Sequence, residues 1–442
     1  MEAYQSWGRY TRASHEVVRP FWRPRSLDLS GLPATALPYG AGRSYGDVCL
    51  NHGGGLIDCR GLDRFLGFDR HQGVLACEAG ATLAEILGLA VPGGWFLPVT
   101  PGTSLITLGG AIANDVHGKN HHRAGAFGRH VRRLELLRSD GARLICSPSR
   151  NPELFAATVG GMGLTGLITW AEIQLKPLSS PELTVETIKF HGLEEFEELS
   201  RQSDQHWEYT VAWLDALSRQ NPRRGLFMRA KHMPGPSERP QADARPRALL
   251  SAPFDWPGWA LNAWTLRAFN LLYYHRQRPR LKKTVQPFAG FLYPLDAIDQ
   301  WSRIYGRKGM MQFQCVVPFG QSEALRAMLD LIARSGTGSF LAVIKAFGDT
   351  PSPGLISFPR PGITFALDFA FKGPKTLALF KELIAVTRAA EGALYPAKDA
   401  CMGADDFQAF YPNWPELAKH VDPRFSSSFW RRVTQGQREF LP

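Results

Sequence analysis

The stretch from Pro98 to His122 constrains the fold of this chain more than any other. Its glycines and prolines disfavour an ordinary helix, while its apolar middle, Leu108-Gly109-Gly110-Ala111, disfavours a solvent loop. Glycines let a backbone approach a ligand closely, and free N–H groups suit phosphates and ring carbonyls. Polar side chains close the stretch: His117, Lys119, His121 and His122. This order predicts a cofactor site with reactive groups beside it, and the alternative is a Gly-rich crossover packed in a core.

The composition bounds the class of protein. The chain has 442 residues, 44% apolar and 21% charged, which suits two or three globular domains with a large core. Six scattered cysteines without a CxxC pair disfavour a metal ribbon or a disulfide scaffold and fit a reducing compartment; we expect no metal site. The first residues lack the apolar core of a signal peptide, and no uncharged run is long enough to span a bilayer. We therefore expect a cytoplasmic protein.

The net charge of +11 favours anionic partners. A phosphorylated substrate, an anionic membrane face and nucleic acid all fit this charge. The sequence has no zinc finger, RNA-recognition motif or arginine-rich arm, so we expect no nucleic acid.

A second glycine loop follows the short strand expected at 36–39. Gly40-Ala41-Gly42-Arg43-Ser44-Tyr45-Gly46-Asp47 has three glycines in seven residues, and it suits a pyrophosphate held by backbone amides with added charge from Arg43. The spacing is not GxGxxG, and a plain Gly-rich turn is the alternative. The later string 161–166 does fit GxGxxG, but a strand is expected after it, so we interpret it as a tight turn and not as a Rossmann loop.

Local patterns predict the elements around these loops. Strands are expected at 55–58 and 74–78, a helix capped by Thr82 follows at 82–89, and 134–137 with 143–146 form a hairpin around Ser139-Asp140-Gly141. A further helix is expected after Asn151, which caps it, with Pro152 in its first turn.

The character of the chain changes after Pro177, where we place a domain boundary. The expected strands and helices that follow suggest helices laid over one antiparallel sheet. They are the strands 184–190, 209–214, 225–230, 312–318, 340–347 and 363–369 and the helices 193–203, 322–334 and 375–390.

A Pro-rich polar segment, 233–246, is expected to be mobile. The stretch 256–283 then joins tryptophans and tyrosines to a basic run. Aromatic rings beside clustered cations suit a membrane interface. The alternative is a flap or helix packed on the domain.

Several blocks together resemble a known family. Gly40–Asp47 and Pro101–Ala113 resemble the FAD-binding core of the vanillyl-alcohol oxidase family, with its PCMH-type domain. The blocks 117–122, 312–314 and 395–399 are similar to its decaprenylphosphoryl-β-D-ribose 2′-oxidase branch, in the same order over nearly the whole chain. The resemblance implies an α+β fold: a two-part FAD-binding domain, residues 1–178 and 393–442, around a substrate domain, 179–392, with an antiparallel sheet covered by helices and a mobile loop near 233–285.

The same resemblance assigns the cofactor site. It implies that the FAD phosphates lie on the loop 40–46 and the isoalloxazine ring near 102–118. Covalent relatives attach FAD through a His in the first loop; this chain has Ser44-Tyr45 there, so we expect noncovalent FAD. The implied cofactor-binding residues are Gly40, Ala41, Gly42, Arg43, Ser44, Tyr45, Pro101, Gly102, Thr103, Ser104, Gly109, Gly110, Ala113, Asn114, His117, Gly118, Ile168 and Tyr395.

Five residues are implied on the substrate side: Lys398, Lys119, His117, Gln314 and Lys345. We expect Lys398 to act as base or to orient the alcohol, Lys345 and Gln314 to contact hydroxyls, and His117 and Lys119 to place flavin and substrate. For any single lysine, the alternative is a solvated surface charge. Two positions depart from the family pattern: Ala366 stands where mycobacterial members have an active-site Cys, and Leu292 replaces an aromatic that approaches the substrate.

The implied reaction is FAD-dependent oxidation of a secondary sugar hydroxyl by hydride transfer to flavin N5. The substrate is a pentose carried on a polyprenyl phosphate, with the ribose 2′-OH becoming a ketone for glycan or cell-wall precursor synthesis. The implied partners are this sugar lipid, the inner membrane surface through 256–283, and an NAD(P)H-dependent keto-sugar reductase. Two alternatives are open: oxidation of a free alditol, aldonolactone or nucleoside sugar, and a binding protein that keeps the fold without redox chemistry.

Overall fold

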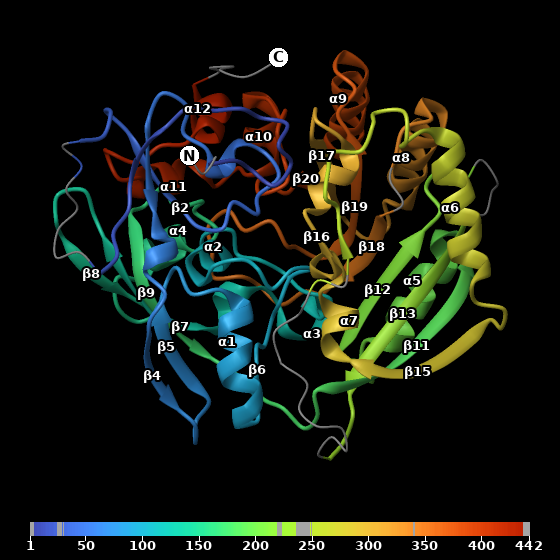
Figure 1. Ribbon diagram of the computed structural model, residues 1–442, viewed down its shortest axis with the longest axis horizontal. Helices are drawn as coiled ribbons and strands as arrows, with labels where there is room; N and C mark the ends of the chain where they lie inside the picture. Colours follow the sequence, from blue (N-terminus) through green and yellow to red (C-terminus); the bar gives the residue numbers. More distant parts are fainter. Residues whose placement is uncertain are drawn as a thin grey trace.

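Two lobes lie side by side in the computed structural model, each built on one large antiparallel sheet (Figure 1). The structure describes residues 4–23, 29, 31–218, 223–235, 248, 250–338 and 341–435. Within these residues, no helix has the length and apolar character needed to cross a membrane.

The first lobe contains a five-stranded antiparallel sheet in the order β4-β5-β9-β7-β8. Its strands are β4 (Phe65–Asp69), β5 (Val74–Glu78), β7 (Val131–Leu137), β8 (Arg143–Cys146) and β9 (Leu167–Gln174). A small parallel sheet joins β1 (Glu16–Val18), β3 (Gly55–Asp58) and β2 (Ala36–Tyr39), and β6 (Trp95–Phe96) pairs with β10 (Lys176–Pro177). The helices of this lobe are α1 (Leu83–Ala90), α2 (Leu108–Ala113), α3 (His121–Ala124) and α4 (Pro152–Thr158).

Local chemistry explains several of these elements. Thr82 and Glu85 form a reciprocal capping box at the start of α1, as the sequence predicts. The β7–β8 hairpin and the turn before β9 are also confirmed. Asn151 precedes α4, but its backbone is left-handed, with φ of 50°, and its side chain does not cap the helix. The amide instead donates to the carbonyl of Ile145 at 2.8 Å, so the predicted side-chain cap is wrong.

The second lobe contains an eight-stranded antiparallel sheet in the order β15-β11-β13-β12-β18-β19-β17-β20. Its strands are β11 (Glu182–His191), β12 (Tyr209–Leu214), β13 (Arg224–His232), β15 (Leu281–Pro287), β17 (Met310–Val317), β18 (Ala342–Phe347), β19 (Gly362–Ala370) and β20 (Ala393–Leu394). A short parallel pair joins β14 (Leu250–Ser251) and β16 (Ile298–Asp299). The helices are α5 (Gly192–Ser203), α6 (Ala263–His275), α7 (Phe288–Leu292), α8 (Ser322–Ser335) and α9 (Pro374–Ala389).

The two faces of the large sheet have different neighbours. On β17, Met311, Phe313 and Cys315 join the core shared with α8 and α9. Gln312 and Gln314 alternate with them and face the first lobe, because successive strand residues point to opposite faces. The expected helices over one antiparallel sheet are therefore confirmed, and the uncovered face is free to build a site.

The expected domain limits can be compared with these sheets. The strands of the five-stranded sheet span 65–174, and those of the eight-stranded sheet span 182–394. The expected boundary at 393 thus falls on β20, the last strand of the large sheet. The expected mobile loop near 233–285 lies partly outside the described residues, at 236–247 and 249, and its remainder contains β14, α6 and part of β15.

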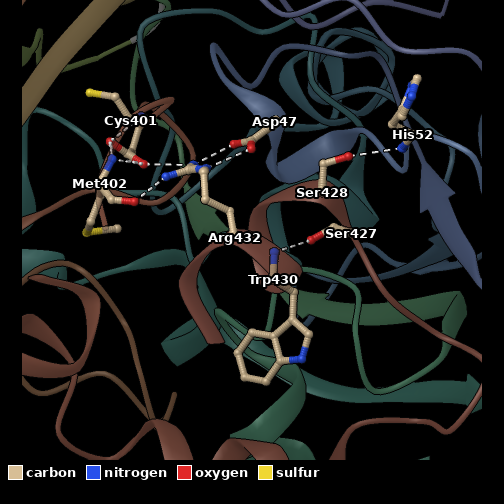
Figure 2. A network of polar contacts seen from close by, with 9 residues as sticks. Asp47, His52, Cys401, Met402, Ser427, Ser428, Trp430 and Arg432 are labelled. Carbon is tan, nitrogen blue, oxygen red and sulfur yellow. Dashed lines mark hydrogen bonds and ion pairs between the residues drawn. The ribbon is translucent and has the colours of Figure 1, made fainter. Parts of the chain in front are cut away.

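The last segment returns to the first lobe. It forms α10 (Ala404–Phe410), α11 (Trp414–His420) and α12 (Ser428–Thr434), drawn in red near the N-terminus in Figure 1. On α12, the guanidinium of Arg432 donates to Asp47 at 2.7 and 2.9 Å and to Asp399 at 3.0 Å, and Figure 2 shows it between Asp47 and Met402. This buried cation ties the first glycine loop to the segment after β20.

Replacing Arg432 with alanine should lower the free energy of unfolding by about 3–5 kcal/mol, because two buried carboxylates lose their cation. Urea unfolding followed by circular dichroism measures the change. Lys419→Ala is the matched control, because its ion pair with Glu416 is exposed and should contribute less than about 1 kcal/mol. Equal losses in the two variants would contradict a special role for the Arg432 contact.

Candidate active site

A cavity of about 950 Å³ lies where the two lobes meet. This volume is at the upper end of the range for small-molecule sites, roughly 300–1,000 Å³. Its walls come from the first glycine loop, the stretch 101–119, the turn 162–168, the free face of the large sheet, and the segment 395–398. The site is therefore assembled from segments far apart in the chain.

The first wall is the loop 40–45, which leaves β2. Within the described residues, the backbone N–H groups of 41–44 have no hydrogen-bond partner. Gly42 has a φ of +62°, and a Cβ on it would meet the Gln5 carbonyl at 2.6 Å. The Arg43 guanidinium stacks on the Trp7 ring at 4.1 Å, and its buried Nε has no hydrogen-bond partner in the part of the chain that the structure describes. These free donors suit a pyrophosphate.

The glycines of the stretch 98–122 were expected to disfavour a helix, and the structure differs from this expectation. Residues 108–113 form the short helix α2, whose start is capped by Thr107, so glycine content does not exclude a helix here. Gly109 packs its backbone against Ala79, where a Cβ would lie 3.0 Å from that of Ala79. The glycine therefore serves close packing of α2 as well as the cavity wall.

The second lobe holds the loop 101–104 in place. The carboxylate of Asp296 accepts hydrogen bonds from the Ser104 amide and hydroxyl, both at 2.7 Å, and from the Thr103 hydroxyl. The hydroxyls of Tyr293 and Thr100 are 2.8 Å apart. Ser104 is fully buried in this contact and does not line the cavity, which leaves its predicted cofactor contact unsupported.

His117 lies in the part of the cavity wall that also holds Lys119, Gln314, Lys345 and Lys398, which we call the reactive wall. Its ring packs among Phe347, Phe358 and Tyr395, with centroids 4.8, 5.8 and 5.6 Å away. Burial, reinforced by Lys345, His121 and Lys398, lowers the pKa of His117 well below its usual value, so the ring is neutral. A neutral imidazole has one donor nitrogen and one acceptor nitrogen.

Two proton arrangements satisfy the His117 contacts. Gln314 Nε2 lies 3.0 Å from Nε2 of the ring, and Lys345 Nζ lies 3.2 Å from Nδ1. With Lys345 neutral, Nδ1–H donates to the amine and Nε2 accepts from the amide. With Lys345 charged, Nδ1 accepts from the ammonium, and the Gln314 amide turns its oxygen toward Nε2–H. A charged Lys345 therefore requires the oxygen of the Gln314 amide, and not its nitrogen, to face Nε2.

Three lysine side chains line this wall, and each has a lowered pKa. Burial lowers the pKa of Lys119 to about 7, and Asp296 opposes the shift. Burial, with added repulsion from Lys119 and Lys398, lowers that of Lys345 to about 7. Burial lowers the pKa of Lys398 to about 8, and Asp368 opposes the shift. Desolvation brings the pKa values of these clustered amines close to neutral pH. The neutral form of each amine can then act as a base, and the charged form can bind an anion.

The contacts of Lys119 and Lys398 differ. Lys119 Nζ donates to the carbonyl of Leu292 at 2.8 Å and is 5.5 Å from the centre of the Phe291 ring. Lys398 Nζ lies 3.9 Å from the centre of the Tyr45 ring, and within the described chain it has no hydrogen-bond partner. Lys398 is therefore the amine most available to a ligand.

The structure brings nearly all the predicted residues to this one cavity. The five predicted catalytic residues line it, as do all the predicted cofactor residues except Ser104. Ala366 also lines the cavity and lies opposite Gln314 in the β17–β19 register. Leu292 does not line it; its carbonyl holds Lys119, and the neighbouring Phe291 takes the position at the wall.

Two residues that were not among the predicted site residues, Gln312 and Asp296, complete the site. Gln312 lines the cavity and donates to the buried carboxylate of Asp368 at 2.5 Å. Tyr305 also donates to that carboxylate, at 3.2 Å. The two-residue spacing of Gln312 and Gln314 on one strand was a usable signal for Gln312. Asp296 gave no such signal, because its partners lie more than 190 positions away.

The residues present fit a flavin dinucleotide. The unpaired amides of 41–44 and the Arg43 Nε suit the two phosphates. The Asn114 Oδ1 is buried without a partner, next to the cavity, and can accept from a ring N–H. Tyr395 donates to the Asn114 carbonyl at 2.9 Å and fixes that side of the wall.

Comparison with known proteins agrees with this fit. A family model described as an FAD binding domain matches residues 31–147. The chain is 36% identical over 415 residues to a decaprenylphosphoryl-beta-D-ribose oxidase of Mycolicibacterium smegmatis, covering 89% of this chain and 88% of that protein. It is 32% identical to an uncharacterized protein of Streptomyces coelicolor, over 80% of this chain and 99% of that protein.

A more distant likeness is restricted to one part of the chain. The human Delta(24)-sterol reductase is 31% identical over 112 residues, which is 25% of this chain and 22% of that protein. The two long matches, in contrast, cover 89% and 80% of this chain and therefore include parts of both lobes. The chain therefore belongs to the family of FAD-binding oxidoreductases that includes the mycobacterial decaprenylphosphoryl-beta-D-ribose oxidase.

Proposed function

We propose that this oxidoreductase converts a secondary hydroxyl of a lipid-phosphate-linked pentose, the 2′-OH of ribose, to a ketone. The mycobacterial relative, a decaprenylphosphoryl-beta-D-ribose oxidase, supports the substrate class. The observation that carries the proposal is the meeting of Lys119, Lys345 and Lys398 in one cavity that is also lined by a loop of free amides. Such a wall can bind a phosphate, and it can bind and deprotonate a sugar hydroxyl.

FAD, when bound, supplies the hydride acceptor, and the protein supplies binding, orientation and a proton acceptor. We assign the proton acceptor to Lys398. Its amine faces the cavity beside Tyr45, and its lowered pKa, about 8, makes the neutral form accessible near physiological pH. The hydroxyl proton moves to Nζ as the alcohol carbon is oxidised.

The remaining groups place the substrate. Lys345 and Gln314 each contact one ring nitrogen of His117, which holds the amine and the amide at a fixed spacing. Both groups can then contact the sugar hydroxyls. Lys119 is held by the Leu292 carbonyl and adds positive charge at the same wall, where it suits a phosphate. We also propose that the ketone passes to a separate NAD(P)H-dependent reductase.

We propose that FAD is held without a covalent bond. The first loop has Ser44 and Tyr45 where a His would attach the flavin, and the ring of His117 is engaged by Gln314 and Lys345. Heat denaturation should therefore release yellow colour into the supernatant. Colour that stays with the precipitated protein would contradict noncovalent binding.

Lys398→Met should slow flavin bleaching by about 10²- to 10⁴-fold, because it removes the proposed base while keeping a side chain of similar length. Anaerobic titration with polyprenyl-phosphoryl ribose measures the bleaching, and free alditols, aldonolactones and nucleosides are titrated in parallel. Lys419→Met, on the exposed face of α11, is the control. Unchanged bleaching in yellow Lys398→Met would remove Lys398 from the mechanism, and bleaching by a free sugar alone would replace the proposed substrate.

The rate of flavin bleaching should rise with pH and level off above about 8, because the charged form of Lys398 cannot accept a proton. Below that pH, the rate should fall about tenfold for each pH unit, as one protonation dictates. Stopped-flow measurement at saturating substrate gives the profile. A rate that stays constant from about pH 6 to about pH 9 would show that no group with this pKa acts as the base.

A further inference from the structure

The cavity does not end at the lysines. It continues along the free face of the large sheet, across β18, β12, β13 and β11, to the edge strand β15. Residues that line it on successive strands are Lys345, Val211, Met228, Val185 and Thr284. Met228 lies opposite Val211 on one side and Thr187 on the other in the strand register, so these positions form a continuous groove.

The chemistry of the groove changes along its length. Gln314 on β17 and Lys345 on β18 lie at the near end, whereas Val343, Val211, Met228 and Val185 line the middle, where Thr187 adds one hydroxyl. Aliphatic and thioether side chains offer no strong hydrogen bonds, so the middle suits a hydrocarbon and not a sugar or a phosphate.

The far end opens beside α6, whose outer surface is unusual. Trp264 is 80% exposed and Leu272 is 71% exposed, and Leu271 and Phe269 are exposed as well. The opposite face of α6 is anchored, since Asn270 donates to Asp215 at 2.7 Å and Tyr274 packs against Trp213. A helix that buries one face and still exposes an apolar surface has an unpartnered face.

Other helices of this lobe do not share this surface. The outer side of α8 carries Glu323, Arg326 and Asp330, and that of α5 carries Glu194 and Glu195. Unlike α5 and α8, α6 therefore exposes several large apolar side chains, and Trp259 beside it is 76% exposed.

Cations border the same surface. Arg276, Arg278 and Lys282 are exposed, and within the described residues they form no ion pair with a carboxylate. Arg276 also stacks on Tyr273 at 3.9 Å, and both line the mouth of the groove. Tryptophans with adjacent cations match the boundary of an anionic bilayer, where rings lie at headgroup depth and cations meet phosphates.

We propose that this α6 surface (Trp259, Trp264, Phe269, Leu271 and Leu272 with Arg276, Arg278 and Lys282) docks on a bilayer of anionic lipids. The groove then takes the first isoprenoid units of the substrate, so that its sugar phosphate reaches the lysines while the rest of the chain stays in the bilayer. This second part rests on the proposed function. A second copy of the chain is a poorer partner, because pairing two such surfaces brings like charges together.

Vesicle co-sedimentation of the full chain with FAD bound tests the docking surface. Vesicles that contain phosphatidylglycerol should bind it, high salt should weaken the binding, and vesicles of phosphatidylcholine alone should bind it less. The double variant Trp264→Ser, Leu272→Ser should lose at least about tenfold in partitioning, since two large apolar side chains no longer enter the lipid. Phe319→Ser is the control, because Phe319 is 52% exposed outside this surface.

Two results would overturn the docking proposal. One is equal partitioning of the double variant and the wild type. The other is a wild-type dimer in gel filtration that the double variant abolishes, together with no vesicle binding by either protein.

Met228→Trp tests the groove by blocking its middle. The ratio of kcat/KM for a long-chain to a one-isoprene ribosyl phosphate, measured in detergent, should fall at least about tenfold relative to the wild type. Met228→Phe should give a smaller fall, and FAD content reports folding of both. An unchanged ratio in folded Met228→Trp overturns the groove proposal. Failure of wild-type enzyme to oxidise either compound overturns the proposed function instead and leaves the vesicle result intact.

Discussion

Two backbone hydrogen bonds, on either side of Pro396, hold the site together. The Tyr395 amide donates to the Gln314 carbonyl at 3.0 Å, and the Tyr45 amide donates to the Ala397 carbonyl at 2.9 Å. Together they join the large sheet, the first glycine loop and the turn that carries Lys398. Gly46 permits this approach, because a Cβ there would overlap the backbone of Asp399. The amide-lined loop and the reactive lysine can only be neighbours while this junction is intact.

The junction also sets the electrostatics of the wall. It buries the amine of Lys398 next to those of Lys345 and Lys119, and charged amines lose hydration there. Asp368 opposes the lowering of the Lys398 pKa, but its carboxylate accepts its shortest hydrogen bond from Gln312. The wall therefore keeps an excess of amines over carboxylates. Such an arrangement destabilises the protein without an anionic ligand, and functional sites commonly carry this kind of cost.

Much of this architecture was predictable, and the failures have physical causes. The strands of the large sheet and helices such as α1 follow from local periodicity and capping, which act over a few residues. The glycines of the first loop favoured a pyrophosphate site on local grounds, whereas the lysines came from motif resemblance, because nothing local places Lys398 beside Tyr45. The sequence could not show that Ser104 is engaged by Asp296, because this partner belongs to the other lobe. The helix α2 was missed because tertiary packing on Ala79 outweighs the low helix propensity of glycine.

A broad antiparallel sheet explains how one cavity can hold such different chemistry at its two ends. Each of these strands contributes one to three residues to the cavity, while side chains on the other face of the sheet stay in the core with the helices. Lining residues can therefore change strand by strand without repacking that core. Ala366 illustrates this freedom: it lies opposite Gln314 at the lysine end of the cavity, where a larger side chain would narrow the space. Under the proposed function, β17 and β19 contact the sugar, and β13 and β11, three or more strands away, contact its carrier.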